Sequence, residues 1–183
     1  MRKSIGGTSV ALLVAALILV AYAGNAGAQE LRAELEFLRP LMNHTWSGHY
    51  MSGGPEAQRL VHEVTWEPIL EGQVLKSIKR VEAADFTMET LYYWDPSQSA
   101  VRYIGLTNRG QLVRGLVSLD EDVFVLTGEQ ANRDEVVNYR QTFELLDDST
   151  LEDKFRTLGD DSRNAGHVIH YRDSGDTLED NRK

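Results

Sequence analysis

Residues 136–158 read VVNYRQTFELLDDSTLEDKFRTL, two runs of alternating apolar and polar side chains around an acidic pair. Residues two apart in a β-strand point to the same face of a sheet, so this alternation predicts two half-buried strands. Asp147 and Asp148 between the runs favour a short turn, and short turns join antiparallel neighbours. The segment therefore predicts an antiparallel pair of strands.

The same pattern continues outward over almost the whole chain. The expected strands are Thr45–Met51, Arg59–Glu67, Gln73–Glu82, Thr87–Trp94, Ala100–Thr107, Gln111–Leu119, Val123–Gly128, Val136–Leu146, Thr150–Leu158 and Gly166–Arg172. Turn sequences such as Asp95-Pro96 and Asn108-Arg109-Gly110 separate them. Many short strands with short links favour a closed barrel or a sandwich. We expect an all-β fold, an antiparallel up-and-down β-barrel of about ten strands.

One segment before the strands has helical periodicity. In Glu30–Met42, Leu31, Leu35 and Leu38 fall on one face, and Pro40 ends or kinks the helix. A short amphipathic helix in this position is typical of a cap over one end of a barrel.

The N-terminus has the pattern of a signal peptide. Arg2 and Lys3 precede the apolar run Val10–Val20, and Ala26-Gly27-Ala28 offers a cleavage site. We expect residues 1–28 to be removed and the barrel domain to span 29–172. A disordered polar tail is expected over 173–183, and the location is expected to be periplasmic or secreted, without membrane insertion after cleavage.

Composition limits the possible partners. Without residues 1–28 the chain has 17 Lys and Arg against 28 Asp and Glu, a formal charge of −11. Such a surface repels phosphate backbones, so nucleic acid is not expected as a partner. The chain contains no cysteine, which excludes thiolate zinc sites and cysteine nucleophiles. No pair of histidines lies on one face of a predicted strand, so no metal site is expected.

Polar residues on predicted interior faces are the best candidates for a site. A buried polar group costs about 1–3 kcal/mol unless it finds a partner, so these residues need a reason to be inside. They would orient a small ligand against aromatic walls, or bond to each other and to trapped water. The candidate ligand-binding residues are His62, Trp66, Tyr92, Trp94, Tyr139, Gln141 and Asp153.

Four short motifs carry a resemblance to a known group of proteins. They are NHTWSGHY (43–50), WEPILEG (66–72), YWDP (93–96) and LTGE (126–129). Their order over residues 35–172 resembles a bacterial family of secreted, lipocalin-like (calycin-like, nitrobindin-like) barrels of unknown function. The chain departs from the family pattern at His44 and Glu71, where the family prefers glycine.

The resemblance implies structural roles and a ligand cavity. Trp46 matches the tryptophan that closes one end of such barrels, a residue often stacked by an arginine. Gly72 and Gly128 match glycines in turns. Related barrels bind haem through a histidine, and His62 or His167 would be the candidates, although no position matches that histidine.

Three functions are therefore open. The leading hypothesis is an exported barrel that binds a small, largely apolar molecule in its cavity. The alternatives are an enzyme that uses a His/Asp pair in the same cavity, and a filled barrel that serves as an interaction or structural module. No motif identifies catalytic residues, and no cofactor other than haem is suggested.

Overall fold

The computed structural model of the protein describes residues 30–133, 135–159 and 166–175. The predicted signal peptide lies outside these residues, as does the predicted tail from residue 176 onward. Among the described helices, none has the length and apolar character needed to cross a membrane.

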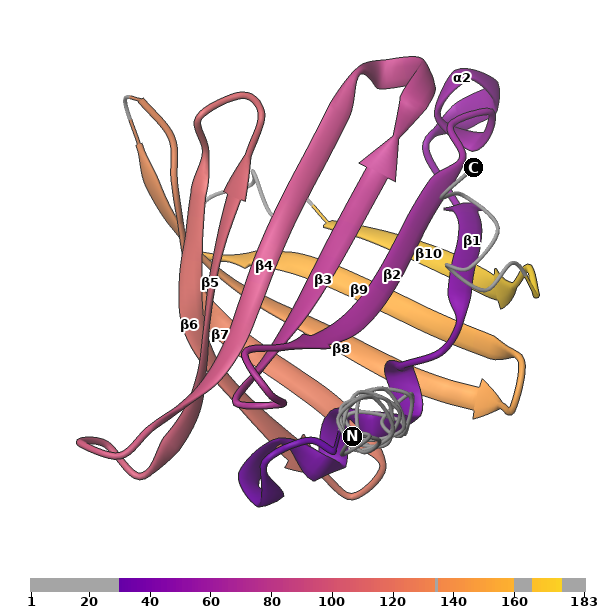
Figure 1. Cartoon of the computed structure of the whole chain (residues 1–183). Coiled ribbons are helices and arrows are strands. Elements are labelled where there is room, and N and C mark those ends of the chain that lie inside the picture. Colours follow the sequence, from indigo (N-terminus) through magenta and orange to yellow (C-terminus); the bar gives the residue numbers. More distant parts are fainter. Residues whose placement is uncertain (1–29, 134, 160–165, 176–183) are drawn as a thin grey trace, which may run out of the picture. The chain divides into compact units, whose positions relative to one another are not determined.

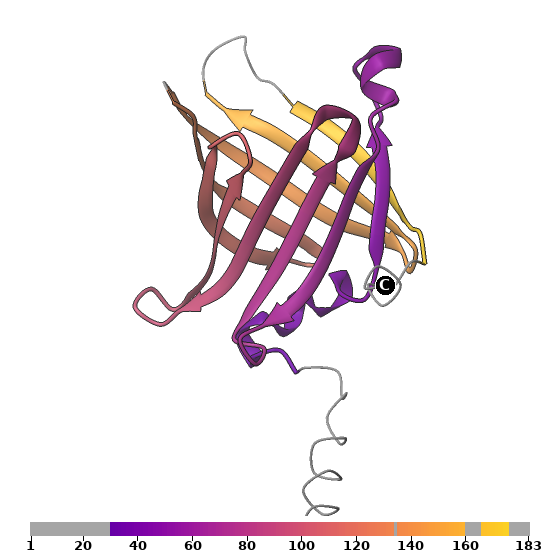
Figure 2. The same cartoon turned by 45° about the horizontal axis from the view of Figure 1, so that its top comes forward.

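Ten antiparallel strands close into a barrel, which confirms the predicted fold (Figures 1 and 2). The strands are β1 (Thr45–Tyr50), β2 (His62–Ile69), β3 (Val74–Val81), β4 (Phe86–Asp95), β5 (Ala100–Thr107), β6 (Leu112–Asp120), β7 (Val123–Ala131), β8 (Val136–Asp147), β9 (Thr150–Leu158) and β10 (Gly166–Asp173). Each strand pairs with its neighbours in sequence, and β1 pairs with β10 to close the ring. No strand edge is therefore left open for pairing with another chain.

Short connections join the strands at both ends of the barrel. The β2–β3 turn places Leu70, Glu71 and Gly72 at φ angles of 51°, 56° and 78°. Gly72 thus lies in the predicted turn, in a backbone region that glycine adopts without steric cost. Two further short helices lie at the opposite end, α2 (Gly54–Gln58) between β1 and β2, and η2 (Glu82–Ala84) between β3 and β4.

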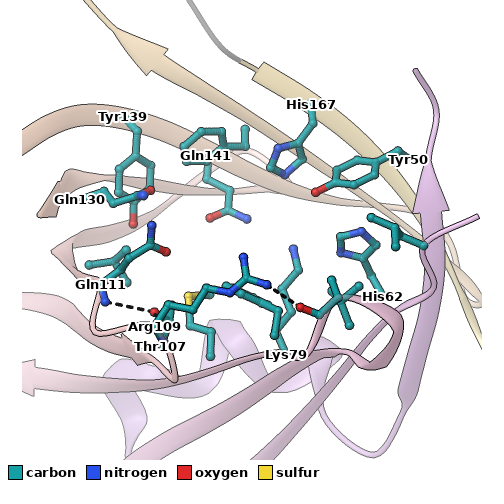
Figure 3. A pocket seen from close by; sticks show the side chains of 17 residues that line it. Tyr50, His62, Lys79, Thr107, Arg109, Gln111, Gln130, Tyr139, Gln141 and His167 are labelled. Atoms are coloured by element: carbon teal, nitrogen blue, oxygen red, sulfur yellow. Dashed lines mark hydrogen bonds between the residues drawn. The ribbon is translucent and has the colours of Figure 1, made fainter. Parts of the chain in front are cut away.

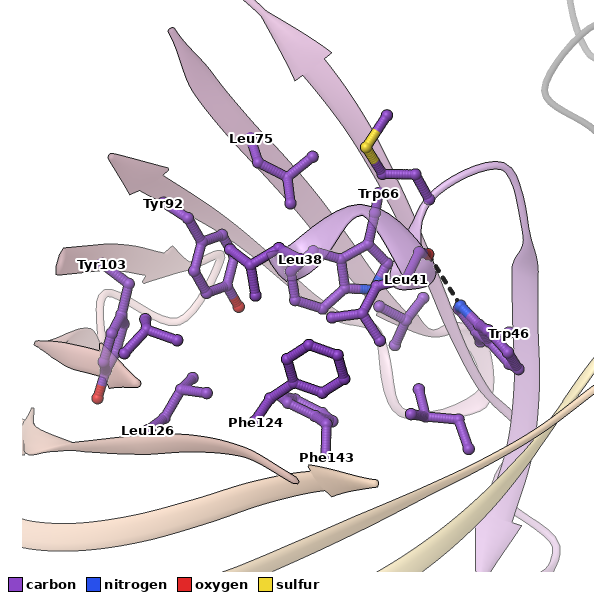
Figure 4. Packing of buried hydrophobic residues seen from close by; sticks show 14 of the residues in the cluster. Leu38, Leu41, Trp46, Trp66, Leu75, Tyr92, Tyr103, Phe124, Leu126 and Phe143 are labelled. Atoms are coloured by element: carbon purple, nitrogen blue, oxygen red, sulfur yellow. Dashed lines mark hydrogen bonds between the residues drawn. The ribbon is translucent and has the colours of Figure 1, made fainter. Parts of the chain in front are cut away.

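The predicted N-terminal helix is present but is a 3₁₀ helix, η1 (Ala33–Leu41), with Pro40 inside it. Leu35, Leu38 and Leu41 are buried, and their spacing of three matches the three residues per turn of a 3₁₀ helix. These side chains pack into one end of the barrel (Figure 4). The sequence predicted an α-helix, with 3.6 residues per turn, and this was wrong for the segment. The residues that pack into the barrel end are three apart, which is the period of a 3₁₀ helix.

Trp46 lies where η1 meets the barrel and is fully buried. Its Nε1–H donates to the carbonyl oxygen of Leu41 at 3.0 Å (Figure 4). The His44 ring lies 4.7 Å from the Trp46 ring, centroid to centroid, in the place where the resemblance implied an arginine. Trp46 therefore ties the first strand to the helix that closes this end.

Two predicted boundaries change. Gly128 is not in a turn, because it pairs with Gly115 and Tyr139 in the middle of β7. Strand β10 runs to Asp173, one residue beyond the predicted domain, and Ser174 N–H still donates to Thr45 O at 2.9 Å. The predicted disordered tail therefore does not begin at residue 173.

Candidate functional site

A cavity of about 410 Å³ occupies the end of the barrel opposite η1 (Figure 3). Strand residues and the β3–β4 and β5–β6 connections form its wall. The lining residues are Tyr50, Leu60, His62, Lys79, Val81, Ala84, Phe86, Met88, Thr107, Arg109, Gln111, Val113, Gln130, Tyr139, Gln141, Phe155 and His167. The interior at this end is therefore a space with a mixed polar and apolar wall.

Among the described residues that line this cavity there is no carboxylate, although the chain has 28 Asp and Glu. Lys79 and Arg109 are the cationic residues in it, together with three glutamine side chains. Arg109 lies in the β5–β6 turn, where its Nη2 donates to Ala84 O at 2.5 Å and its guanidinium lies 5.5 Å from the Phe86 ring centre. These contacts fix a positive charge at the rim without neutralising it.

Asp153 lies below the cavity and is completely buried. Gln141 Nε2 donates to its Oδ1 at 2.7 Å, and Lys79 Nζ lies 3.4 Å from its Oδ2. Strands β3, β8 and β9 supply these three side chains. A buried charge needs an opposite charge and hydrogen bonds, and this cluster provides both.

Two histidines face the cavity from β2 and β10. Tyr50 lies between them, with ring centres 4.4 Å from His62 and 5.2 Å from His167, and Phe155 stacks on His167 at 5.1 Å. Burial, with a smaller effect of the Lys79 charge, lowers the pKa of His62 to about 3. Burial also lowers the pKa of His167, partly opposed by Asp153. Both rings are therefore neutral at pH 7.

Nitrogens of both rings lack a protein partner. In His62 neither Nδ1 nor Nε2 has one within the described part of the chain, and in His167 the same is true of Nε2. An unpaired buried nitrogen costs about 1–3 kcal/mol, which a ligand or water in the cavity would offset. Both residues line the cavity, and no described protein group satisfies these nitrogens.

Tyr139 completes the wall through a contact that crosses two strands. The Tyr103 hydroxyl donates to the Tyr139 hydroxyl at 2.7 Å. Gly115 and Gly128 lie between these tyrosines, in register, and a Cβ on Gly128 would come within 2.4 Å of the Tyr103 oxygen. Because neither glycine has a side chain, there is space for this hydrogen bond between the tyrosines. Burial also raises the pKa of the Tyr103 hydroxyl to about 12.

A smaller cavity of about 30 Å³ lies deeper in the barrel, below the first. Trp66, Tyr92 and Asp153 are on its wall, among aromatic and aliphatic side chains. Figure 4 shows Trp66 and Tyr92 within the packed hydrophobic residues. The Trp66 Nε1–H has no hydrogen-bond partner among described groups. This volume has room for little more than a water molecule, so the deep part of the barrel is packed core.

The predicted site residues thus separate into three groups. His62, Tyr139 and Gln141 line the main cavity, and Trp66, Tyr92 and Asp153 lie in the packed region below it. Trp94 lines neither cavity, because it is near the η1 end and packs against the core there. The alternation of residues along each strand predicted the face of these side chains but not their height in the barrel.

Sequence reasoning missed Lys79 and Arg109. In β3 the inward residues are Leu75, Ser77, Lys79 and Val81, a pattern masked by the outward Ile78. Arg109 lies in a turn, where no periodic signal exists. A turn prediction does not say which side chain bends back over the barrel opening.

No hydrogen bond or ion pair between a histidine and an acidic residue is found among the described residues that line the cavity. The Asp153 oxygens are bonded to Gln141 and Lys79, and the hydrogen-bonded His–carboxylate pairs of the described residues are His44–Asp173 and His170–Glu152 on other surfaces. Within residues 30–133, 135–159 and 166–175, no three His, Asp or Glu side chains gather as metal ligands would.

No family model matches this chain, and a search of curated proteins finds no match either. The resemblance to secreted lipocalin-like barrels therefore stays a prediction from the four motifs.

The geometry does allow a test of the haem expectation. His62 and His167 both present a buried imidazole nitrogen with no protein partner, and neutral imidazole is the proximal ligand of haem iron in many proteins. The donor chemistry at these two positions therefore fits a haem, and the choice between haem and another ligand becomes an experimental one.

Proposed function

We propose that this protein is a binding protein that holds one small, largely apolar molecule with a polar end in the cavity opposite η1. The cavity carries the proposal, because its volume of about 410 Å³ lies within the range of small-molecule sites. Apolar walls with a few placed polar groups are typical of such sites.

The wall suggests how a ligand would be oriented. Val81, Met88, Val113 and Phe155 offer apolar contact. Arg109 offers a charged donor at the rim, and none of the described wall residues is a carboxylate that would repel an acidic or hydrogen-bond-accepting ligand. A ligand with an apolar body and an acceptor at the rim fits both features.

A pair of fluorescent probes tests this proposal. Anilinonaphthalene sulfonate carries a negative charge, and N-phenylnaphthylamine has a similar apolar body without one. We expect both to bind at one site per chain. A hydrogen bond to a charged group contributes about 1.5–3 kcal/mol, so Arg109→Met is expected to weaken sulfonate binding tenfold or more and leave the neutral probe unchanged.

The matched control is Arg114→Met on the outer face of β6, where Arg114 is exposed and paired with Glu129. This change is expected to leave both affinities as they were. The proposal fails if neither probe binds, or if bound probe is not displaced by the other. Equal effects of the two arginine variants would reject the role of Arg109.

Native mass spectrometry of freshly purified protein identifies the bound class. A co-purified lipid mass supports an apolar cargo. A Soret absorbance band that is lost in His62→Phe or His167→Phe identifies haem as the ligand instead. Protein without any bound mass and without probe binding contradicts the proposal.

A further inference from the structure

On the outer face of the barrel, two arginines lie directly opposite each other. Arg140 on β8 and Arg156 on β9 are cross-strand partners, and both side chains point outward because their neighbours Tyr139, Gln141 and Phe155 line the interior. Like charges in this position destabilise a sheet. A negative group between the two guanidinium groups would relieve this repulsion.

No such group is found among the described residues. Arg140 is half-buried and Arg156 is exposed, and no hydrogen bond or ion pair joins either guanidinium to another described side chain. The next charged pair in the same two strands behaves differently. Glu144 and Glu152 are also opposite each other, but Glu152 pairs with Lys154 and with His170, the latter at 2.9 Å. Within the described part of the chain, the arginine pair, unlike the glutamate pair, has no counter-charge.

The arginines open into a groove of about 410 Å³ on this face. Beside Arg140 and Arg156, the groove is lined by Lys154 and by the hydroxyl side chains of Ser52 and Thr142. None of the described residues that line it is a carboxylate, in a chain of net charge −9. Guanidinium forks and hydroxyl groups are the donors that bind tetrahedral oxyanions, often through two parallel N–H···O bonds.

We infer that this groove binds a phosphate-type oxyanion, free or as the head of a phosphate monoester, between Arg140 and Arg156. The anion supplies the missing negative charge, and its oxygens accept from both guanidinium groups. The groove shares Phe155 and His167 with the lining of the interior cavity, but the guanidinium groups that would hold the anion point to the outer face.

Titration calorimetry with inorganic phosphate tests the inference, with sodium chloride of equal ionic strength as the reference. We expect phosphate to bind the full-length protein and to raise its melting temperature, because a ligand that binds only the folded state stabilises it. Arg140→Gln/Arg156→Gln is expected to weaken phosphate binding at least tenfold. Arg156→Lys, which keeps the charge and loses the fork, is expected to fall between the two.

Arg114→Gln is the matched control, since it removes an outward arginine that already has the partner Glu129. It is expected to leave phosphate affinity unchanged. The melting temperature of the double variant in phosphate-free buffer checks that it folds. We expect no loss there, because the substitution removes a repulsive pair.

The source of the anion is separated by two further probes. Binding of glycerol phosphate in solution supports a soluble ligand. Binding only to vesicles that contain phosphatidic acid, and not to phosphatidylcholine vesicles, supports a lipid headgroup.

Two results would overturn the inference. One is a wild-type protein that binds phosphate no better than chloride. The other is binding that appears only in Asp160→Asn/Asp161→Asn, which would show that the chain's own acidic residues between β9 and β10 take the place of the anion.

Discussion

At the scale of single residues, His62 makes folding stability depend on pH. The unfolded chain protonates this imidazole near pH 6.5, and the folded protein does so only near pH 3. Between these values the unfolded state binds more protons, so folding stability rises with pH. Stability is therefore lost as the pH falls below about 6.5, and His167 adds to the loss because its pKa is lowered too.

His62→Phe is expected to make the unfolding free energy less dependent on pH between 6.5 and 5. Urea unfolding at half-unit steps of pH measures this slope, above the range where most carboxylates titrate. The control is His49→Phe, which removes an exposed imidazole from the outer face of β1. A slope identical to the wild type in His62→Phe would contradict the buried, neutral state of His62.

Gly128 shows a second way in which one residue shapes the site. The sequence places it in an LTGE motif that predicts a turn, yet it lies within β7 under the Tyr103–Tyr139 hydrogen bond. A Cβ there would come within 2.1 Å of Arg114 O. The glycine is thus required by close approach between strands, which local sequence does not reveal.

At the scale of elements, η1 closes one end of the barrel with three leucines at a spacing of three residues. Pro40 has no backbone N–H and cannot donate a hydrogen bond within the helix. Leu38 and Leu41 on either side of it are nevertheless buried in the core with Trp46 and Phe124. Tertiary packing therefore decides both the type and the length of this helix.

Leu38→Ala is expected to lower the unfolding free energy by about 2–5 kcal/mol, because it opens a cavity where a fully buried side chain was. Urea unfolding measures the loss. Glu36→Ala is the control on the same helix, since its ion pair with Arg39 is exposed and contributes at most about 1 kcal/mol.

The two ends of the barrel are expected to be independent. Leu38→Ala should therefore leave the affinity for N-phenylnaphthylamine unchanged under conditions where the protein is folded. A loss of stability no larger than that of Glu36→Ala would contradict the role of η1 as the packed end.

At the scale of the whole molecule, the barrel is completed by pairing between its first and last strands. Trp46 in β1 is the register partner of Asp173 in β10. The His44 Nδ1 lies 2.8 Å from Asp173 Oδ2, and Ser174 N–H donates to Thr45 O. Closure therefore depends on residues at the end of the predicted domain.

A chain shortened after Arg172 is expected to melt several degrees below the full chain, because it loses these contacts. One kcal/mol corresponds to about 2–4 °C for a domain of this size. A chain shortened after Gly175 is the control and is expected to melt like the full chain. Calorimetry that finds both truncated chains equally stable would show that Asp173 and Ser174 do not contribute to closure.

The sequence by itself determined the class of fold, the number of strands and the inward face of residues such as His62, Gln141 and Asp153. Those properties follow from a period of two along each strand, which is local. The tertiary structure alone decided that Lys79 meets Asp153, that Tyr103 reaches Tyr139 and that Arg109 lies at the rim. These contacts depend on strand register and on closure of the barrel. Alternation along a strand determines which face a side chain is on, but not how far along the barrel axis it lies.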